Sequence, residues 1–369
     1  MIKLKELKPS ASMELTRMAK SMKDQGKKVY TLSIGDTHFN LPASLAAEIV
    51  NLPEAASHYG SAQGVAKLRE SIAEIYEDYA ADSVIIVPGL KQGFFYALEA
   101  IEGKRVAVLE PSWLGYQATC TLAGCEYLPV NTYKSDWTDT LKSMDFDILM
   151  LCSPNNPDGN IITANQVESL YSIATEKDAW VILDLIYERY TYIDIDIKAL
   201  LRPILGYHKT IVGNGFSKSH AMTGYRIGYL LVKNANVMSN ILKIQQNLAT
   251  CASSFAQHLL SKNHSPIEIE NFVSYYRENR ETVLNIFPEW KVFAPQGGFY
   301  FFVDLSVYGI TDASEFCMDL LQNHGIAIVP GAAYGYGFDN YIRISFSLDR
   351  NGLEEALENL KNVLTTYHA

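Results

Sequence analysis

The chain has 369 residues, of which 48% are apolar and 20% are charged, as is usual for a folded globular protein. This length exceeds one compact domain and falls short of three, so we expect two lobes or one large α/β unit. The net charge of −10, from 31 basic and 41 acidic residues, argues against nucleic acid or an anionic membrane as the main partner. Both of those partners need clustered lysine and arginine.

The cysteines and the N-terminus indicate the compartment. The chain has five cysteines and no Cys-x-x-Cys pair, so neither a disulfide framework nor a zinc site is expected. The first residues, MIKLKELKPS, lack the continuous apolar segment of a secretory signal. No apolar run reaches the roughly 18 residues needed to cross a bilayer. These features predict a cytoplasmic protein with no membrane segment and no metal site.

The N-terminal two thirds of the chain alternate between helical and strand patterns. A helix is expected from Glu14 to Gln25, a strand from Val29 to Ile34, and a helix with one apolar face from Gly64. A Thr163/Gln166 capping box starts a later helix. Strands are expected at VIIV (84–87), VAVL (106–109), ILMLC (148–152), WVILD (180–184), TIVGN (210–214) and YRIGYLLV (225–232). Short apolar strands separated by helices predict an α/β fold whose mostly parallel central sheet has helices on both faces.

The pattern changes after about Val237. Long helical patterns run through the 240s to the 280s, and strands follow from Phe299, Ile326 and Ile342 before a final amphipathic helix from Arg350. This order predicts a smaller α+β domain, which the N-terminal helix joins. We expect a large domain of residues 42–262 and a small domain formed by residues 1–41 together with 263–369.

The strand ends carry the residues that suggest chemistry, because the site of an open α/β sheet lies beyond the carboxyl ends of its strands. The strands lead into PGLKQ (88–92), EPSWLGY (110–116), SPNNPDG (153–159), Asp184 with Tyr187, and GFSK (215–218). Each segment alone has a simpler interpretation: SPNNPDG is a good turn, and Asp184 could cap a helix. Their occurrence at successive strand ends predicts one shared site. The sequence GNGFSKS lacks the glycine that precedes a P-loop lysine, and no dinucleotide-binding G-x-G-x-x-G is present.

These motifs resemble those of fold-type I pyridoxal phosphate enzymes of the class I/II aminotransferase family, the aspartate-aminotransferase-like group. The segments HYGSAQGVAKLRESIA, SPNNPDG, DLIY, FSKSHAMTGYRIGY and PGAAYGYGFDNYIRISFS follow in the family's order. The likeness extends over nearly the whole chain. It implies the large and small domains of that family and pyridoxal phosphate as the cofactor.

The resemblance implies a role for each residue at the cofactor ring. Lys218 would form the Schiff base and then carry a proton between the substrate and the cofactor, which requires a partly neutral amine. Asp184 would keep the ring nitrogen protonated. Tyr187 and Asn156 would hydrogen-bond the phenolic oxygen, and Trp113 would lie over the ring face. Trp113 and Asn156 would also border the substrate.

The cofactor phosphate would bind at the start of a helix. The amides of Gly89, Leu90 and Lys91 offer N–H groups and a favourable dipole. Arg226, eight residues after the lysine as in the family, would pair with the phosphate. A serine that is frequent three residues before the lysine is Gly215 here, which would leave a backbone N–H in place of the hydroxyl.

The substrate and a second subunit complete the implied site. Arg343 matches the arginine that binds the substrate α-carboxylate, and Gly35 matches a glycine whose backbone contacts the same group. The following loop departs from the family's Gly-x-Pro-x-Phe, because Thr37 replaces the proline. Tyr59 matches a tyrosine that reaches the phosphate of the neighbouring subunit, which implies a homodimer with shared active sites.

The implied activity is an aminotransferase that moves an amino group from an L-amino acid to a 2-oxo acid. A carbon–sulfur β-lyase or an amino-acid decarboxylase is the alternative, because the reaction depends on which substrate bond stands perpendicular to the ring. A cofactor-binding regulator without catalysis ranks below both, since the chain has no added DNA-binding helices or basic arm.

Overall fold

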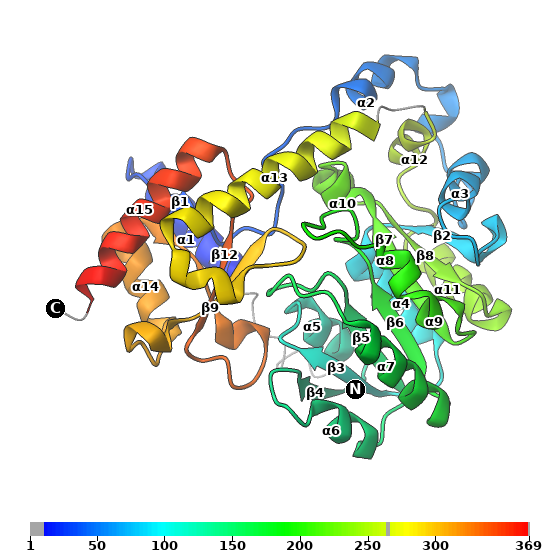
Figure 1. Cartoon of the computed structure of the whole chain (residues 1–369). Coiled ribbons are helices and arrows are strands. Elements are labelled where there is room, and N and C mark those ends of the chain that lie inside the picture. The colour runs from blue at the N-terminus through cyan, green and yellow to red at the C-terminus, as the bar shows by residue number, and fades with distance from the viewer. Residues whose placement is uncertain (1–10, 263–265, 368–369) are drawn as a thin grey trace.

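The computed structural model describes residues 11–262 and 266–367, and these residues form two lobes that lie side by side (Figure 1). The large lobe comprises a seven-stranded sheet and the helices from α2 to α12. The small lobe comprises α1, β1, the strands β9 to β12 and the helices α13 to α15. Among the described residues, no helix has both the length and the apolar character that a bilayer crossing requires.

The large-lobe sheet has the predicted, mostly parallel arrangement. Its strands are β2 (Val84–Val87), β3 (Arg105–Glu110), β4 (Glu126–Asn131), β5 (Ile148–Cys152), β6 (Trp180–Asp184), β7 (Thr210–Gly215) and β8 (Gly228–Val232). They are ordered β2-β8-β7-β6-β5-β3-β4. Strand β8 is antiparallel to both of its neighbours, and the other pairs are parallel. The sequence pattern did not predict β4, an edge strand that contains Pro129, and proline is tolerated at such an edge.

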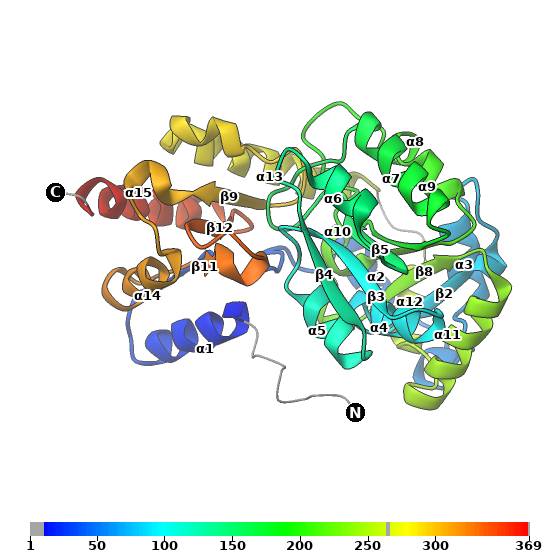
Figure 2. The same ribbon diagram turned by 90° about the horizontal axis from the view of Figure 1, so that it is seen from below.

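Helices cover both faces of this sheet, as predicted (Figure 2). Side chains alternate along a strand, so neighbouring residues such as Ile85 and Ile86 belong to different apolar cores. One core includes α4 (Leu90–Ala100), α5 (Gly115–Leu122) and α11 (Ala235–Leu248). The other includes α3 (Ala66–Ala73), α7 (Ala164–Glu176), α9 (Arg202–Gly206) and α12 (Ser254–Leu260). Burial on both faces explains why these strands are almost wholly apolar.

The large lobe also contains shorter helices. They are α2 (Ala43–Glu48), α6 (Trp137–Ser143), α8 (Ile197–Leu200) and α10 (Phe216–Ser219). The predicted capping box is present at α7, where Gln166 N donates to Thr163 Oγ1 and Thr163 N donates to Gln166 Oε1. The apolar pattern of the helix expected from Gly64 continues to Tyr79, but the observed helix α3 ends at Ala73. Beyond it, Tyr79 is still buried and donates to the carbonyl of Leu205 at 3.0 Å.

The small lobe has the predicted α+β character. Its antiparallel sheet is ordered β11-β12-β9, from β11 (Val329–Pro330), β12 (Tyr341–Ser345) and β9 (Tyr300–Asp304). Its helices are α1 (Ala11–Asp24), α13 (Pro266–Ile286), α14 (Ala313–His324) and α15 (Arg350–Thr366). The strand expected from Val29 to Ile34 is confirmed only at β1 (Tyr30–Thr31), which pairs with β10 (Ile326–Ala327). The carbonyls of Leu32 and Ser33, which follow β1, instead accept hydrogen bonds from Ser345 N and from the Arg343 guanidinium, respectively.

A buried carboxylate joins the two lobes at the end of β3. Glu110 is 2% exposed, and burial raises the pKa of its carboxyl group. Its Oε1 accepts from the Tyr127 hydroxyl at 2.6 Å, and its Oε2 accepts from Tyr336 N of the small lobe at 3.0 Å. Close by, Ser112 N donates to the carbonyl of Tyr334 at 2.8 Å. The loop before β12 is therefore fixed to the large lobe.

We expect Glu110→Ala to lower the free energy of unfolding by about 1–3 kcal/mol, because the Tyr127 hydroxyl and Tyr336 N–H would lose their buried acceptor. Urea unfolding followed by circular dichroism measures this loss. The exposed Glu126 on β4 provides the matched control, and Glu126→Ala should change stability by less than about 0.5 kcal/mol. Equal unfolding midpoints for the two variants would contradict the assigned role of Glu110.

Candidate active site

A cavity of about 480 Å³ lies at the carboxyl ends of the parallel strands, where the two lobes meet. The large lobe contributes most of its lining, and the small lobe contributes Ser33, Ile34, Gly35, Asp36, Tyr300 and Arg343. All of the residues that the sequence singled out line this cavity except Tyr59, Gly89 and Gly215. Strand ends that are far apart in the sequence therefore converge as predicted.

Lys218 reaches from the large lobe towards the small lobe. It lies on α10, the single helical turn that follows β7, and Tyr190 donates its hydroxyl hydrogen to the carbonyl of Lys218 at 2.9 Å. The Lys218 Nζ donates to the carbonyl of Gly35 at 2.5 Å. Burial disfavours the ammonium form and lowers the pKa of Lys218 to about 8. A substantial fraction of this amine is therefore neutral near neutral pH.

Asp184 is the carboxylate on the large-lobe side of the cavity. It ends β6, is 4% exposed, and accepts at Oδ2 from the Tyr116 hydroxyl at 2.7 Å and at Oδ1 from Ile186 N at 2.9 Å. Burial raises the pKa of Asp184 to about 6. The sequence motifs alone did not assign Tyr116 to the site. Its spacing of three residues from Trp113 was the available signal, and the two rings meet edge to face at 5.4 Å.

A chain of polar contacts crosses the cavity between the lobes. Arg343 Nη1 donates to Asn156 Oδ1 at 3.3 Å, and Asn156 Nδ2 donates to the Tyr187 hydroxyl at 3.5 Å. The Tyr187 and Tyr300 hydroxyl oxygens are 3.0 Å apart. Tyr300 is the second residue that the sequence analysis missed, because it lies inside FYFFVDL, an apolar run that gave only a strand signal.

Arg343 is a buried cation whose Nε has no hydrogen-bond partner among the described residues. It is 2% exposed, and its Nη2 donates to the carbonyl of Ser33 at 2.6 Å. Its guanidinium carbon lies 4.2 Å from the ring centre of Tyr300 and 5.1 Å from that of Tyr334. A buried guanidinium with an unused N–H suits an anion brought in from outside.

A second cationic region lies at the start of α4. Gly89 precedes this helix with a φ of +83°, and a Cβ there would lie 2.6 Å from Arg226 Nη2. Glycine thus leaves the space that the guanidinium occupies. Lys91, in the first turn, lies 5.1 Å from the ring centre of Trp113, and burial lowers its pKa. Helix N–H groups beside an arginine and a lysine form a site for a multiply charged anion.

Gly89 lies beside Arg226 at the edge of the cavity, whereas two other predicted residues lie apart from it. Tyr59 is 87% exposed on the surface of the large lobe. Gly215 lines a neighbouring cavity, and its N–H donates to Asn214 Oδ1 at 2.7 Å. The N–H that was expected to replace a serine hydroxyl at the phosphate is therefore already used, and the structure does not bring Gly215 into the site.

Comparison with known proteins identifies the family. Residues 27–360 match the family model described as aminotransferase class I and II, and the chain belongs to this family. It is a pyridoxal phosphate-dependent aminotransferase of the α/β fold found in its structural relatives.

Relatives match the chain over nearly its full length. The (5-formylfuran-3-yl)methyl phosphate transaminase of Methanocaldococcus jannaschii is 32% identical over 95% of this chain and 96% of its own. The aspartate aminotransferase of Thermotoga maritima is 30% identical over 99% of both chains. A Methanococcus jannaschii structure, described as similar in its active site to kynurenine aminotransferases, has a TM-score of 0.87 at 30% identity and covers 98% of both chains.

The residues present fit pyridoxal phosphate. The hollow beside Gly89 admits Arg226 at a helix start that suits a phosphate. Asp184 offers a buried carboxylate to a cationic ring nitrogen, and Lys218 offers a desolvated amine to an aldehyde. The cavity therefore supplies each kind of group that the cofactor needs.

The pKa of Lys218 predicts how pH affects cofactor uptake by the cofactor-free protein. Only the neutral amine attacks an aldehyde, and the neutral fraction grows as pH rises through about 8. The rate of pyridoxal phosphate uptake, followed by absorbance, should therefore increase roughly tenfold from pH 7 to pH 9. The Lys218→Ala variant should show no covalent uptake at any pH. A rate that does not change over this interval would contradict the lowered pKa.

Proposed function

We propose that the protein transfers the amino group of an L-amino acid to a 2-oxo acid, with Lys218 as the lysine that binds the cofactor covalently. One observation carries this assignment: Lys218, Asp184 and Arg343 line the same cavity. When bound, pyridoxal phosphate supplies the carbonyl carbon that takes up the amino group and a ring that accepts the electron pair left at the substrate α-carbon. The transaminase names of the relatives favour this reaction over the lyase and decarboxylase alternatives.

Lys218 acts as the base and acid of the reaction. Its lowered pKa leaves a neutral Nζ that removes the proton from the substrate α-carbon and later returns it at another carbon. The carbonyl of Gly35 orients this nitrogen from the small lobe. Burial stabilises the ammonium form poorly, so a larger fraction of Lys218 is the neutral amine that can accept a proton.

The large lobe would hold the ring. Asp184, fixed by Tyr116 and Ile186 N, would pair with the ring nitrogen and keep it protonated. Tyr187 and Asn156 would donate hydrogen bonds to the phenolic oxygen, and Trp113 would cover the ring face.

Two cationic regions would hold the anionic groups. The N–H groups of Gly89, Leu90 and Lys91 bind the phosphate together with the Arg226 guanidinium. Arg343 binds the substrate α-carboxylate with its free Nε and a neighbouring Nη, and the Gly35 backbone contacts the same carboxylate. The substrate is thereby held with its α-carbon close to Lys218.

Substitution at Lys218 and Arg343 separates chemistry from binding. Lys218→Ala should lower kcat by about 10²–10⁴-fold, because the proton-transferring group is lost. Arg343→Lys should instead raise KM by roughly tenfold, since an ammonium cannot bind a carboxylate through two parallel N–H groups. Steady-state kinetics with several amino donors measure both effects. The exposed Lys142→Ala is the control, and Lys218→Ala turnover at the rate of this control would refute the assignment.

We also propose that residues 42–262 form the large domain and that residues 1–41 with 263–369 form the small domain. The separate sheets of the two lobes support this division. Residues 1–10, 263–265 and 368–369 lie outside the described residues. The five cysteines are free, and three of them are buried, which supports our proposal of a cytoplasmic location.

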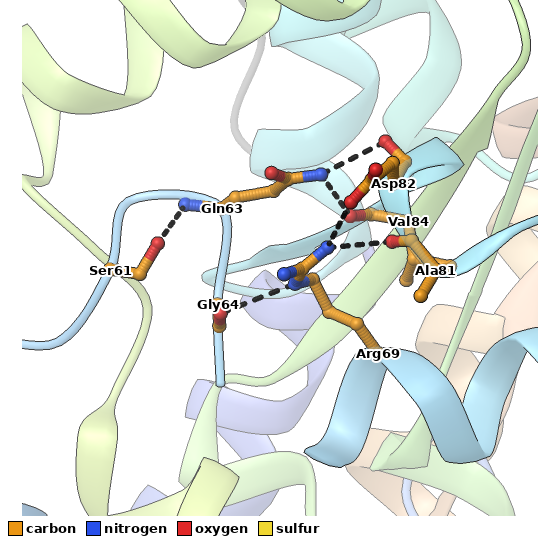
Figure 3. A network of polar contacts seen from close by, with 7 residues as sticks. All are labelled: Ser61, Gln63, Gly64, Arg69, Ala81, Asp82 and Val84. Atoms are coloured by element: carbon orange, nitrogen blue, oxygen red, sulfur yellow. Dashed lines mark hydrogen bonds and ion pairs between the residues drawn. The ribbon is translucent and has the colours of Figure 1, made fainter. Parts of the chain in front are cut away.

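We further propose a homodimer in which Tyr59 serves the partner's active site. The loop after Tyr59 is firmly fixed (Figure 3): Gln63 Nε2 donates to the carbonyls of Asp82 and Val84 at 2.9 and 3.0 Å. Arg69 donates from Nη1 to the carbonyl of Ala81 at 2.7 Å and from Nε to that of Gly64 at 3.3 Å. A rigid loop that presents an exposed aromatic ring to solvent supports a contact with another molecule.

Mixed dimers test this arrangement. Tyr59→Phe alone should weaken cofactor affinity, and Lys218→Ala alone should be inactive. When the two variants are mixed and allowed to exchange subunits, one site of each mixed dimer should contain both Tyr59 and Lys218. Activity at limiting cofactor should therefore rise above the mean of the separate variants. A monomer in sedimentation experiments, or activity equal to the mean, would contradict the shared site.

A further inference from the structure

Tyr300, on β9 of the small lobe, contacts a group on each side of the active-site cavity. It is fully buried and lines the cavity. Its hydroxyl oxygen lies 3.0 Å from that of Tyr187 in the large lobe, and its ring centre lies 4.2 Å from the guanidinium carbon of Arg343. In the proposed function, Tyr187 and Arg343 each have a role and Tyr300 has none.

The ring of Tyr300 supports the Arg343 guanidinium. An aromatic face attracts a cation, and the attraction is stronger where both groups are buried. Arg343 is buried, and its Nη2 is fixed by the carbonyl of Ser33. The ring of Tyr334 lies farther from the guanidinium carbon, at 5.1 Å. The Tyr300 ring is therefore the closer of these two aromatic contacts, and it limits the orientations that the guanidinium can take.

The hydroxyl of Tyr300 can supply a hydrogen to Tyr187. A tyrosine hydroxyl carries one hydrogen and can accept as well as donate. In the proposed function Tyr187 gives its hydrogen to the phenolic oxygen of the cofactor, so the 3.0 Å contact then requires the hydrogen of Tyr300. Asn156 Nδ2 also approaches the Tyr187 hydroxyl, but at 3.5 Å, which is the length of a weak hydrogen bond. Tyr300 is therefore the nearer donor to Tyr187.

The surroundings make the Tyr300 hydroxyl a good donor. Burial raises the pKa of Tyr300, and the positive charge of Arg343 opposes this rise. A cation that favours loss of the proton also strengthens the hydrogen bond that the proton makes, and a bond in a buried chain strengthens its neighbours. Gly35 leaves room for this hydroxyl, because a Cβ at Gly35 would lie 3.0 Å from its oxygen.

We propose that Tyr300 is a positioning residue with two separable roles: its hydroxyl holds Tyr187 as the donor to the phenolic oxygen of the cofactor, and its ring holds Arg343 for the substrate carboxylate. This inference rests on the proposed aminotransferase function. One small-lobe side chain then aligns a group at the cofactor and a group at the substrate.

The first test follows the absorbance of the bound cofactor against pH, without substrate. The absorbance changes when the lysine-linked nitrogen of the cofactor loses its proton, and that loss leaves a negative charge on the phenolic oxygen. Hydrogen bonds to this oxygen stabilise the charge and lower the pH of the transition. Tyr300→Phe should therefore raise the transition by about 0.5–1 pH unit, because Tyr187 becomes a weaker donor. Tyr334→Phe is the matched control and should titrate as the wild type, because the buried Tyr334 hydroxyl has no hydrogen-bond partner among the described residues.

A double variant shows whether Tyr300 acts through Tyr187. Tyr187→Phe alone should raise the transition further than Tyr300→Phe does, because the direct donor is lost. Adding Tyr300→Phe to Tyr187→Phe should move the transition no further, since two residues that act through one contact are not additive. Additive shifts would overturn the proposed route through Tyr187.

The second test measures how carboxylates bind to the holoenzyme. Propionate and 3-phenylpropionate have no amino group, so they bind without reacting, and isothermal titration calorimetry gives their dissociation constants. Tyr300→Phe keeps the ring and should bind both within about twofold of the wild type. Tyr300→Leu loses the ring and should bind both roughly fivefold more weakly. Since Tyr300→Leu also lacks the hydroxyl, it should reproduce the raised transition of Tyr300→Phe.

An unchanged transition in both Tyr300 variants would overturn the role of the hydroxyl, even if urea unfolding of the cofactor-free variants showed a loss of stability. Carboxylate affinity in Tyr300→Leu equal to that of the wild type would overturn the role of the ring. A wild-type protein that binds the cofactor but responds to no amino donor would instead refute the aminotransferase assignment on which the proposal rests.

Discussion

Two groups of opposite charge, the Lys218 amine and the Asp184 carboxyl, are withdrawn from water into one cavity. Burial lowers the pKa of Lys218 to about 8 and raises that of Asp184 to about 6, because each charged form loses its hydration. Each group keeps specific hydrogen-bond partners in exchange, Gly35 for Lys218 and Tyr116 for Asp184. These hydrogen bonds replace only part of the lost hydration. The amine therefore stays partly neutral and the carboxylate stays available to a cation, and the reactivity of the site follows from both.

Neither lobe forms this environment alone. The large lobe supplies Lys218 and Asp184 at its strand ends, and the small lobe closes the cavity with the segment 33–36 and Arg343. Arg343 of the small lobe contacts Asn156 of the large lobe, and Asn156 contacts Tyr187. Tyr187 in turn contacts Tyr300, which again belongs to the small lobe. Glu110 fixes the other side of the same boundary. The position of the small lobe therefore determines the geometry of the substrate side.

Sequence patterns predicted the large-lobe strands other than β4 and the residues at their ends, because strands buried on both faces require continuous apolar runs. They failed where tertiary contacts override local pattern. The segment after Thr31 leaves its strand because Arg343 and Ser345 take its carbonyls. Tyr300 was hidden in an apolar strand, and whether its hydroxyl reaches a site depends on register. Gly215 was expected to contact the phosphate, but its N–H donates to Oδ1 of the preceding residue, Asn214.

The fold and the family do not determine the substrate. Relatives that share about 30% identity with this chain carry names as different as a furan phosphate transaminase and an aspartate aminotransferase. The cofactor-binding side of the cavity follows the family motifs, whereas the wall after Gly35 departs from them. Differences in substrate choice arise from segments of this kind that line the substrate side of the cavity, since the reaction at the cofactor is common to all of these enzymes.

Helix α13 connects the loop that follows Gly35 with the end of the strand that carries Arg343. Its 21 residues span about 30 Å, and Glu268 near its start accepts from Ala43 N at 2.8 Å, at the beginning of α2. Phe39 stacks on Phe272 at 4.0 Å, and further along the helix Asn279 donates to the carbonyl of Phe346, three residues after Arg343. The helix thus acts as a strut between the substrate loop and the strand of Arg343. These contacts hold the loop that contains Phe39 and the segment that follows Arg343 on one rigid helix, so a displacement of either segment is transmitted to the other.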